Sequence, residues 1–335
     1  MATKNSEVLE KKSINMDEIK NANEDDLFYF VDLNTLESEK ITAPRYSYWR
    51  SVFRVFFRKK INWFIIGFFI FLLFMIFVFP IIVPYDKFGN IMDVKGQRLS
   101  PSAALQYYNG DFRYILGTGM ISEPIFIAIW SSARMSFLLA LTCATINMIL
   151  GIVIGALWGY SRRLDMILNI VYNIVANVPY ILLISVLVYV IGRGFGPFVF
   201  ALTITGWIGI AYFFRTQVLI IRDREYNMAS RCLGTSTIKV VSRNVLPFLI
   251  SVIVTILATE LPSYISMEVF LTYIGIGMSA EVPSLGNMIG TYQDGFEQFP
   301  WAFWSPVAIA AAITIILYVL GQNLADASDP RTHMQ

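Results

Sequence analysis

Six long apolar runs, separated by polar stretches, dominate the pattern of this 335-residue chain. A bilayer core needs about 20 mostly apolar residues per helix, and each run is close to that length. Lipid offers no hydrogen-bond partners to a free backbone, so each run must be helical. We therefore predict an all-α integral membrane protein with six transmembrane helices, the third and fifth bent at Pro179 and Pro262. The predicted helices are Ile61–Val83, Met135–Tyr160, Met166–Ile191, Pro197–Phe214, Leu246–Phe270 and Ser305–Gly321.

The positions of Lys and Arg predict which way these helices cross the membrane. Six basic residues lie within 45–60, just before the first helix, and place the N-terminus in the cytoplasm. Crossing six times from there puts the basic loop 217–245 inside as well. The loop 271–304, which contains no Lys or Arg, then lies outside. Both termini are therefore predicted to be cytoplasmic, in a multi-pass protein of the plasma membrane.

The same pattern divides the chain into six segments. They are a polar, acidic cytoplasmic tail (1–44), an interfacial amphipathic helix (45–60), the first transmembrane helix (61–83), an extracellular loop or lobe (84–134), a transmembrane core (135–325) and a cytoplasmic tail (326–335).

The segment 45–60 has an apolar face beside a basic face. The two faces carry Trp49, Val52, Phe53, Phe56 and Phe57, and Arg50, Arg54 and Arg58, respectively. This pattern is typical of a helix lying in the inner interface, with arginines near anionic headgroups. The alternative is a plain continuation of the first transmembrane helix.

Composition supports a membrane protein and excludes several kinds of chemistry. Hydrophobic residues make up 56% of the chain and charged residues 15%, against about 25% charged in soluble domains. Cys143 and Cys232 are far apart and form no CxxC pair, and His333 lies near the C-terminus. Metal clusters and Ser–His or Cys–His catalysis therefore lack their usual residues. We expect a non-catalytic chain with no cofactor of its own.

The cytoplasmic loop 217–245 is long for a connection between membrane helices. It contains a predicted helical stretch from Arg222 to Leu233, then Gly234 as a helix stop and Ser236 as the cap of a second helix. The exposed face of such a protruding unit has nothing in the chain to pack against. We therefore interpret the loop as a docking element, the alternative being a surface connector without a partner.

The segment 225–234, followed by Leu246-Pro247, resembles the EAA loop of ABC import permeases. In that family, the first helix of the loop is a coupling helix that sits in a groove of the ATPase subunit. Residues 228–230 occupy the EAA triplet, with Met228 in place of the usual acid, whose role Glu225 can take instead. The resemblance assigns ATPase coupling to Glu225, Tyr226, Met228, Ala229, Ser230, Leu233 and Gly234.

Further motifs extend this resemblance from about residue 45 to residue 331. They are Leu116–Thr118 with Ser132–Ser136 (LGTD…GARxS in the family), Glu268–Gly277 (EAxLSFLGLG), Pro283–Gly286 and Asp326–Arg331 (D-x-x-DPR). Gly119 stands where the first motif has its aspartate. The chain is most similar to the C-type transmembrane subunits of Gram-positive oligopeptide and dipeptide permeases, the Opp, Dpp and Ami type.

That resemblance implies a type I ABC importer permease fold and a role in oligopeptide import. The implied partners are a homologous second permease subunit, two cytoplasmic ATPase subunits, an extracellular peptide-binding lipoprotein, the peptide substrate and membrane lipid, with no nucleic acid. The chain contains no G-x-x-x-x-G-K-[ST] run. We therefore expect ATP and Mg on the partner ATPases.

Polar residues inside the predicted helices are candidates for the pathway. Asn169, Asn173 and Asn177 fall four apart on the third helix. This stripe can offer amide groups to a peptide, or it can hydrogen-bond a neighbouring helix, a contact worth about 0.6 kcal/mol. On the fifth helix, Glu260 is deep and either faces the pathway or has a structural partner. Glu268 lies near the outer end and is expected to be in water.

Two questions stay open at this point. The outer loop 84–134 is long enough to form a lobe that meets a binding protein, or it is a solvated loop that shields a partner subunit. The alternative function is a secondary, ion-coupled transporter of small peptides or similar solutes, for which Glu260 is the one candidate ion site. Co-purification of ATPase subunits would separate the two functions. An intramembrane enzyme lacks its motifs here.

Overall fold

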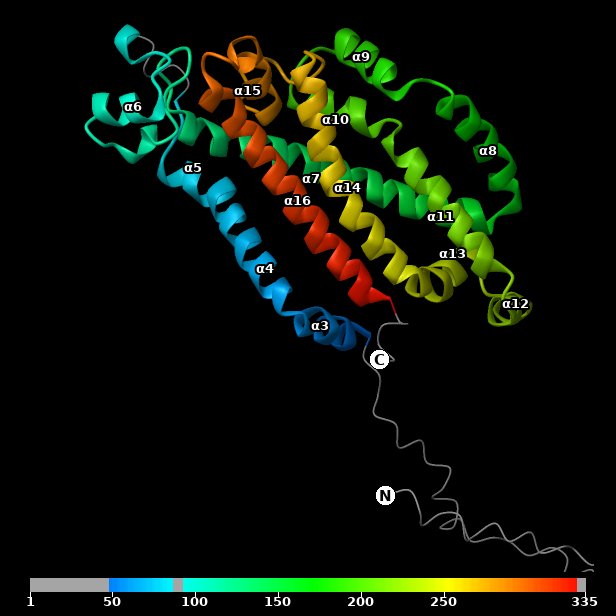
Figure 1. The fold of residues 1–335 in the computed structure, drawn as a ribbon. Coiled ribbons are helices and arrows are strands. Elements are labelled where there is room, and N and C mark those ends of the chain that lie inside the picture. Colours follow the sequence, from blue (N-terminus) through cyan, green and yellow to red (C-terminus); the bar gives the residue numbers. More distant parts are fainter. Residues whose placement is uncertain (1–47, 87–92, 330–335) are drawn as a thin grey trace, which may run out of the picture. The chain divides into compact units, whose positions relative to one another are not determined.

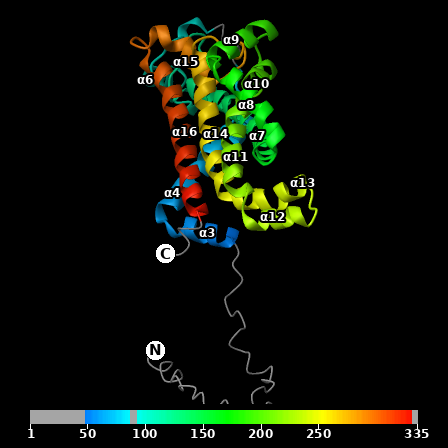
Figure 2. The same ribbon diagram turned by 90° about the vertical axis from the view of Figure 1, so that its right-hand side faces the viewer.

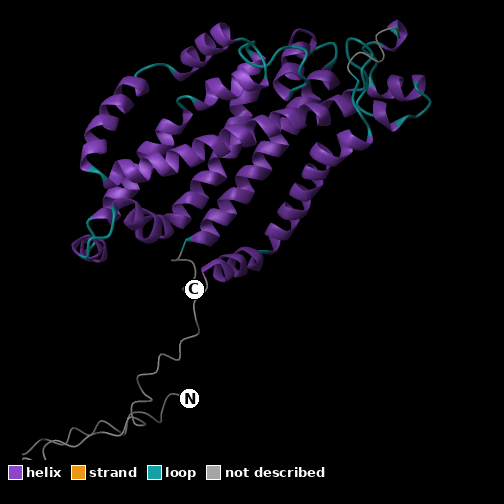
Figure 3. Cartoon of the chain, turned by 180° about the vertical axis from the view of Figure 1, so that it is seen from behind, coloured by secondary structure: helices purple, strands orange, loops and turns teal. Residues whose placement is uncertain are grey.

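The computed structural model describes residues 48–86 and 93–329, and these residues fold into helices joined by loops (Figures 1 and 3). The predicted tail 1–44, Arg331 of the C-terminal motif and His333 lie outside the described residues. Within them, five helices are long and apolar enough to cross a membrane, and a bent pair adds a sixth crossing if it is counted as one span. The predicted all-α membrane fold is confirmed.

The helices that cross have the following bounds. They are α4 and α5 (Lys60–Leu73 and Phe79–Ile82, joined by a π-helical turn), α7 (Ile125–Tyr160), the bent pair α8 (Arg162–Ala176) and α9 (Tyr180–Ile191), α10 and α11 (Phe195–Thr203 and Gly206–Arg222), α13 and α14 (Thr237–Val240 and Ile250–Tyr273) and α16 (Pro300–Ser328). The shorter helices are α3 (Tyr48–Arg58), α6 (Pro101–Tyr107), α12 (Glu225–Cys232) and α15 (Leu285–Tyr292).

The third predicted helix is broken rather than merely bent. α8 and α9 meet at 82°, and residues 177–179 between them are not helical. Proline lacks an N–H and disfavours helical backbone at the residue before it, so the helix ends ahead of Pro179. Pro262 has a weaker effect, because α14 continues through it.

α7 begins at Ile125, so the outer loop is shorter than the predicted 84–134. The motif at 132–136, whose first three residues were predicted to end that loop, lies wholly inside the helix, where Ser132 and Ser136 are buried. The backbone N–H of Leu285 in α15 donates to Ser136 Oγ at 3.0 Å. Small hydroxyl residues suit a helix packed against other helices, which explains why polarity alone misplaced this boundary.

α7 is the central helix and contacts α8, α10, α11, α14 and α15. Towards α11 it presents Gly151, Gly155 and Gly159 at four-residue spacing. A Cβ on Gly155 would lie 2.4 Å from the carbonyl oxygen of Ala211, and one on Gly159 would lie 2.7 Å from that of Arg215. The two backbones approach this closely only because glycine has no side chain, so α7 and α11 form one tight pair.

α3 packs beside the C-terminal end of α16 (Figures 1 and 2). Val52 and Phe56 of α3 cluster with Ala327 of α16, whereas Trp49 and Phe53 remain 47% and 51% exposed. α3 and α4 are separated by one residue with an extended backbone, so α3 is not a continuation of the first crossing. The predicted apolar face is thus divided between a protein contact and an exposed surface.

The described part of the first outer loop forms a small lobe around Asp93. Its carboxylate accepts hydrogen bonds from Tyr108 Oη (2.6 Å), Tyr107 Oη (3.1 Å) and the backbone N–H of Gly96 (3.1 Å). These bonds, with that from Tyr108 first, hold the pKa of Asp93 below its usual range. The lobe therefore has a polar centre that keeps its shape at neutral pH.

Candidate functional site

α12 lies at the same end of the helical bundle as α3, opposite α6 and α15 (Figures 1 and 2). α11 runs to Arg222, so the single helical stretch predicted from Arg222 to Leu233 is split in two. Arg224, just before α12, has an extended backbone. The carbonyl oxygen of Ile221 at the end of α11 accepts from Asn227 Nδ2 at 3.0 Å. The same oxygen also accepts from the backbone N–H of Arg224 at 3.1 Å, and the two bonds satisfy the end of α11 at the sharp turn.

Gly234 ends α12, as the sequence predicts. Its φ of +79° is a left-handed conformation, and its N–H donates to the carbonyl oxygen of Arg231 at 2.9 Å. The N–H of Thr235 donates to the carbonyl oxygen of Ser230 at 3.1 Å, and the two bonds together form a Schellman motif. Ser236 is the N-cap residue of α13, as predicted, although its hydroxyl makes no capping hydrogen bond.

Most of the predicted coupling residues lie on the surface of this unit. The exposed ones are Glu225, Tyr226, Met228, Ala229, Leu233 and Gly234. Ser230 differs, because its hydroxyl donates to the carbonyl oxygen of Tyr226 (2.9 Å) and accepts from Asn244 Nδ2 (3.1 Å). Ser230 therefore helps to fix α12 to the segment after α13. The structure brings all seven residues together, and their contact with an ATPase stays a prediction.

Other residues that fix α12 are missed by sequence reasoning. Asn227 is fully buried. The guanidinium of Arg231 lies 5.0 Å from the ring centroid of Tyr160 on α7, and that of Arg224 lies 5.3 Å from the ring of Phe248. The excess of arginine in the loop is a sequence signal for these contacts, although it also fits the orientation of the loop in the membrane. The aromatic partners could not be assigned, because they lie in other parts of the sequence.

Asp223 pairs with arginines at the turn between α11 and α12. Its Oδ2 lies 3.1 Å from Arg222 Nη2, and its Oδ1 lies 3.5 Å from Arg231 Nη2. The hydrogen bond from Arg222 is the main cause of a lowered pKa for Asp223. Because the pKa of Asp223 is lower in the folded chain than its ordinary value of 3.8, its ionised carboxylate stabilises the fold at any pH above 3.8. This stabilisation is lost only as the pH falls through the lowered pKa. The turn is therefore insensitive to pH near neutrality.

The predicted asparagine stripe lies on α8, which contains no buried residue. Asn169 is half-buried and donates to Asp165 Oδ1 at 3.2 Å. Asn173 and Asn177 are exposed, and Asn177 Nδ2 donates to the carbonyl oxygen of Asn173. These hydrogen bonds join residues of one helix and its cap rather than two helices. A pathway role for Asn169, Asn173 and Asn177 stays a prediction.

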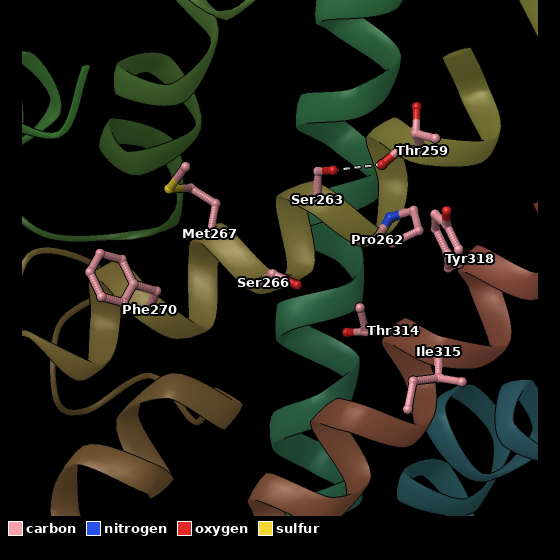
Figure 4. A pocket seen from close by; sticks show the side chains of 9 residues that line it. All are labelled: Thr259, Pro262, Ser263, Ser266, Met267, Phe270, Thr314, Ile315 and Tyr318. Carbon is pink, nitrogen blue, oxygen red and sulfur yellow. Dashed lines mark hydrogen bonds between the residues drawn. The ribbon is translucent and has the colours of Figure 1, made fainter. Parts of the chain in front are cut away.

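A groove between α14 and α16 is lined by hydroxyl and apolar side chains (Figure 4). This open groove has a volume of about 570 Å³, with Thr259, Ser263 and Ser266 on α14. Ser263 Oγ donates to the carbonyl oxygen of Thr259 at 2.7 Å, which satisfies this hydroxyl within its own helix. Sequence reasoning missed the groove, although the three- and four-residue spacing of these hydroxyls was visible. Glu260, beside Thr259 in sequence, is half-buried.

Glu268 is fully buried, so the prediction that it lies in water is wrong. Its Oε1 accepts from Thr272 Oγ1 at 3.2 Å. α15 contacts both α14 and α7, and this short helix covers the C-terminal end of α14. Proximity to the end of an apolar run did not reveal the burial, because the covering helix belongs to the following loop.

The space beside Gly119, where the resembled motif has an aspartate, is taken by another carboxylate. A Cβ on Gly119 would lie 2.1 Å from both Glu123 Oε1 and Tyr292 Oη. The backbone N–H of Ile121 donates to Glu123 Oε2 at 2.8 Å, and Tyr292 Oη donates to Glu123 Oε1. Glu123 thus supplies an acid at this position from four residues further along the chain.

Comparison with known proteins agrees with this architecture. Residues 149–334 match the family described as "Binding-protein-dependent transport system inner membrane component", and residues 47–101 match the "N-terminal TM domain of oligopeptide transport permease C". The chain is 40% identical over 306 residues to the oligopeptide transport system permease protein AmiD of Streptococcus pneumoniae, which covers 91% of this chain and 97% of the relative.

Two relatives from Bacillus subtilis are more distant. The dipeptide transport system permease protein DppC is 28% identical over 314 residues, or 92% of this chain and 93% of the relative. The oligopeptide transport system permease protein OppC is 30% identical over 216 residues, or 64% and 71%. The chain therefore belongs to the family of binding-protein-dependent transport system inner membrane components, with the predicted type I permease fold. It is a non-catalytic membrane subunit, and ATPase activity lies in separate subunits.

Proposed function

We propose that this chain is the transmembrane permease subunit of an ABC importer that carries oligopeptides into the cell, coupled to its ATPases through residues 217–245. The observation that supports it best is α12. This helix is exposed on one face, and it is fixed to the bundle on the other by Asn227 and Ser230. A helix that is exposed on one face and fixed on the other can transmit a displacement from a bound partner to the helical bundle. Relatives named for oligopeptide and dipeptide transport support peptide as the substrate.

The rest of the assembly follows from this proposal. A homologous permease subunit supplies the second half of the pathway. Two cytoplasmic ATPase subunits hold ATP and Mg, and an extracellular lipoprotein delivers peptide at the outer lobe. Both termini and α12 are cytoplasmic, which the basic residues near α3 and α12 support. The relatives from Streptococcus pneumoniae and Bacillus subtilis support a Gram-positive plasma membrane. The exposed Trp49 and Phe53 and the nearby arginines of α3 contact lipid.

Transport then proceeds by displacement of α12. ATP binding draws the two ATPases together and moves the coupling helices that they hold. α12 is tied to α11 at Ile221, and α11 packs on the glycines of α7, so all three helices move as a unit. This motion switches the pathway between outward and inward access. Asn173, Asn177, Glu260 and the hydroxyl groove of α14 are the surfaces that we assign to the peptide.

Gly234→Trp tests the coupling assignment. A Cβ at Gly234 meets no atom within 4 Å, so the fold accepts a side chain at the cost of a left-handed residue, about 1 kcal/mol. The indole would then protrude from the surface that the ATPase grips. We expect reconstituted importer to keep hydrolysing ATP while peptide uptake falls at least tenfold. Uptake and ATP hydrolysis are measured together in proteoliposomes.

Gly275→Trp is the matched control. Gly275 follows α14 with a φ of +80°, has no atom within 4 Å of a Cβ, and lies in the same kind of helix end. We expect it to leave the ratio of ATP hydrolysed to peptide imported unchanged. A normal ratio in Gly234→Trp as well would remove α12 from the coupling role. Wild-type chain that purifies without any ATPase subunit would overturn the ABC assignment and leave ion-coupled transport.

A further inference from the structure

The broken crossing of α8 and α9 has an unusual attachment to the rest of the chain. α8 contains no buried residue. It packs against α7, and α9 packs against α10. Burial of apolar surface therefore contributes little to the position of α8, and a few specific side-chain contacts must hold this helix.

Asp165, in the first turn of α8, makes the polar part of this attachment. Its Oδ1 accepts hydrogen bonds from Trp158 Nε1 of α7 (2.9 Å), from Asn169 Nδ2 of α8 (3.2 Å) and from Arg215 Nε of α11. The side chains of Asp165 and Arg215 are 25% and 13% exposed. A pair shielded to this degree is screened less by salt than a surface pair. One carboxylate oxygen thus joins three helices.

Aromatic rings complete the same contact. The guanidinium of Arg215 lies 5.7 Å from the ring of Trp158 and 5.5 Å from that of Tyr212, within reach of a cation–π interaction. Tyr172 of α8 stacks on Tyr212 of α11, with centroids 4.1 Å apart and planes at 6°. Tyr172 lies about two helical turns after Asp165, on the same face. α8 therefore meets α11 at two successive points.

α11 leads from this contact directly to α12. Arg222, the last residue of α11, lies about two turns, or about 10 Å, beyond Arg215. Arg222 Nη1 donates to the carbonyl oxygen of Gly159 on α7 at 3.2 Å, so the end of α11 is also fixed to the central helix. A rigid connection thus runs from α12 through α11 to Arg215, and across the ion pair to α8.

We propose that Asp165 is a positioning residue of the transport cycle, whose ion pair with Arg215 makes α8 and α9 follow α11 when α12 is displaced. This inference rests on the proposed function of α12. Without the pair, α12 and α11 still move with the ATPases, but α8 lags behind. ATP hydrolysis then continues while fewer peptides are moved. Asn169 acts in this cluster as a support for Asp165.

Asp165→Ala and Asp165→Asn test the proposal in the complete reconstituted importer. Alanine removes all three hydrogen bonds, whereas asparagine keeps the shape and an acceptor oxygen for Trp158 and Asn169 but loses the charge that holds Arg215. We expect the ATP hydrolysed per peptide imported to rise at least fivefold in Asp165→Ala and by a smaller factor in Asp165→Asn. Asp294→Ala, which removes an exposed acid from an outer loop, is the control and should show the wild-type ratio.

Distances between spin labels separate this role from a general loss of structure. Two label pairs share a reference on α4 at Ile70, and the second labels are placed on α8 at Ile174 and on α13 at Ile238. All three side chains are exposed, and Cys232→Ser removes the exposed native thiol. In the wild type, we expect ATP to shift both distances.

In Asp165→Ala, and in Asp165→Asn if the alanine variant does not assemble, the shift at Ile238 should persist while that at Ile174 shrinks to less than half. An undiminished shift at Ile174 overturns the role of Asp165 and leaves the proposed function intact. A wild-type protein in which ATP does not move Ile238 overturns the proposed function itself, and the inference with it.

Discussion

Asn227 holds the exposed helix α12 in place although its own side chain is fully buried. Its amide bonds the last turn of α11, while its neighbours in sequence, Tyr226 and Met228, are 42% and 47% exposed. Adjacent residues of a short helix thus face the bundle and the exposed surface in turn. Asn227 is therefore the buried member of the set of side chains, with Ser230, that holds the exposed face in place.

Asn227→Ala should therefore loosen α12 without unfolding the chain. It removes one hydrogen bond and leaves the carbonyl of Ile221 without this partner, a change worth about 1 kcal/mol. We expect the amide hydrogens of α12 to exchange roughly fivefold faster, measured by mass spectrometry on the detergent-solubilised protein. Met228→Ala, at an exposed position, should exchange at the wild-type rate. Equal exchange in Asn227→Ala and the wild type would contradict the role given to the buried amide.

Among the described elements, α7 and α11 make the most extensive helix–helix contact. Gly155 and Gly159 let the two backbones come into contact, and a longer side chain there meets main-chain atoms that cannot rotate away. In a bilayer, apolar side chains gain nothing by leaving lipid, so close contact of this kind is what holds helices together. This pair is therefore suited to carry a displacement from α12 into the membrane.

Gly155→Leu should disrupt this pair. Even its Cβ would lie 2.4 Å from the carbonyl oxygen of Ala211, so the helices must separate at a cost on the order of 3 kcal/mol. We expect a lower melting temperature in detergent, followed by fluorescence-detected gel filtration. Gly209→Leu, on α11 with no atom within 4 Å of a Cβ, is the matched control and should melt like the wild type. Similar melting of the two variants would show that α7 and α11 are not closely packed.

Element boundaries show where sequence reasoning stopped. The run 61–83 appears as α4 and α5 almost unchanged, because a lipid-facing helix is defined by its own hydrophobicity. The run 166–191 breaks before Pro179 because proline disfavours helical backbone at the residue before it, while Asp165 and Tyr172 hold α8 against α7 and α11. The start of α7 was placed too late because buried serines look like loop residues.

For the whole molecule, the exposed thiol of Cys232 reports on how the chain is oriented in the membrane. Cys232 at the end of α12 is exposed and Cys143 is buried. We expect a membrane-impermeant maleimide to modify Cys232 in inside-out vesicles and not in intact cells, and bound ATPase to slow the modification. Val94→Cys in a Cys232→Ser background, on the outer lobe, should show the opposite sidedness. Modification of Cys232 in intact cells would place α12 outside and exclude any contact with a cytoplasmic ATPase.

The sequence by itself determined that the chain crosses the membrane about six times as helices, which loops are basic, and where the EAA-like unit with Gly234 lies. Partition into lipid, the placement of charges and the backbone freedom of glycine depend on residues close together in the sequence. They can therefore be predicted from the sequence pattern alone. Only the tertiary structure decided that Glu268 is buried under α15, that Tyr292 meets Glu123 beside Gly119, and that Asp165 pairs with Arg215. These outcomes depend on which distant segments pack together, and that is settled by the shapes of whole helices.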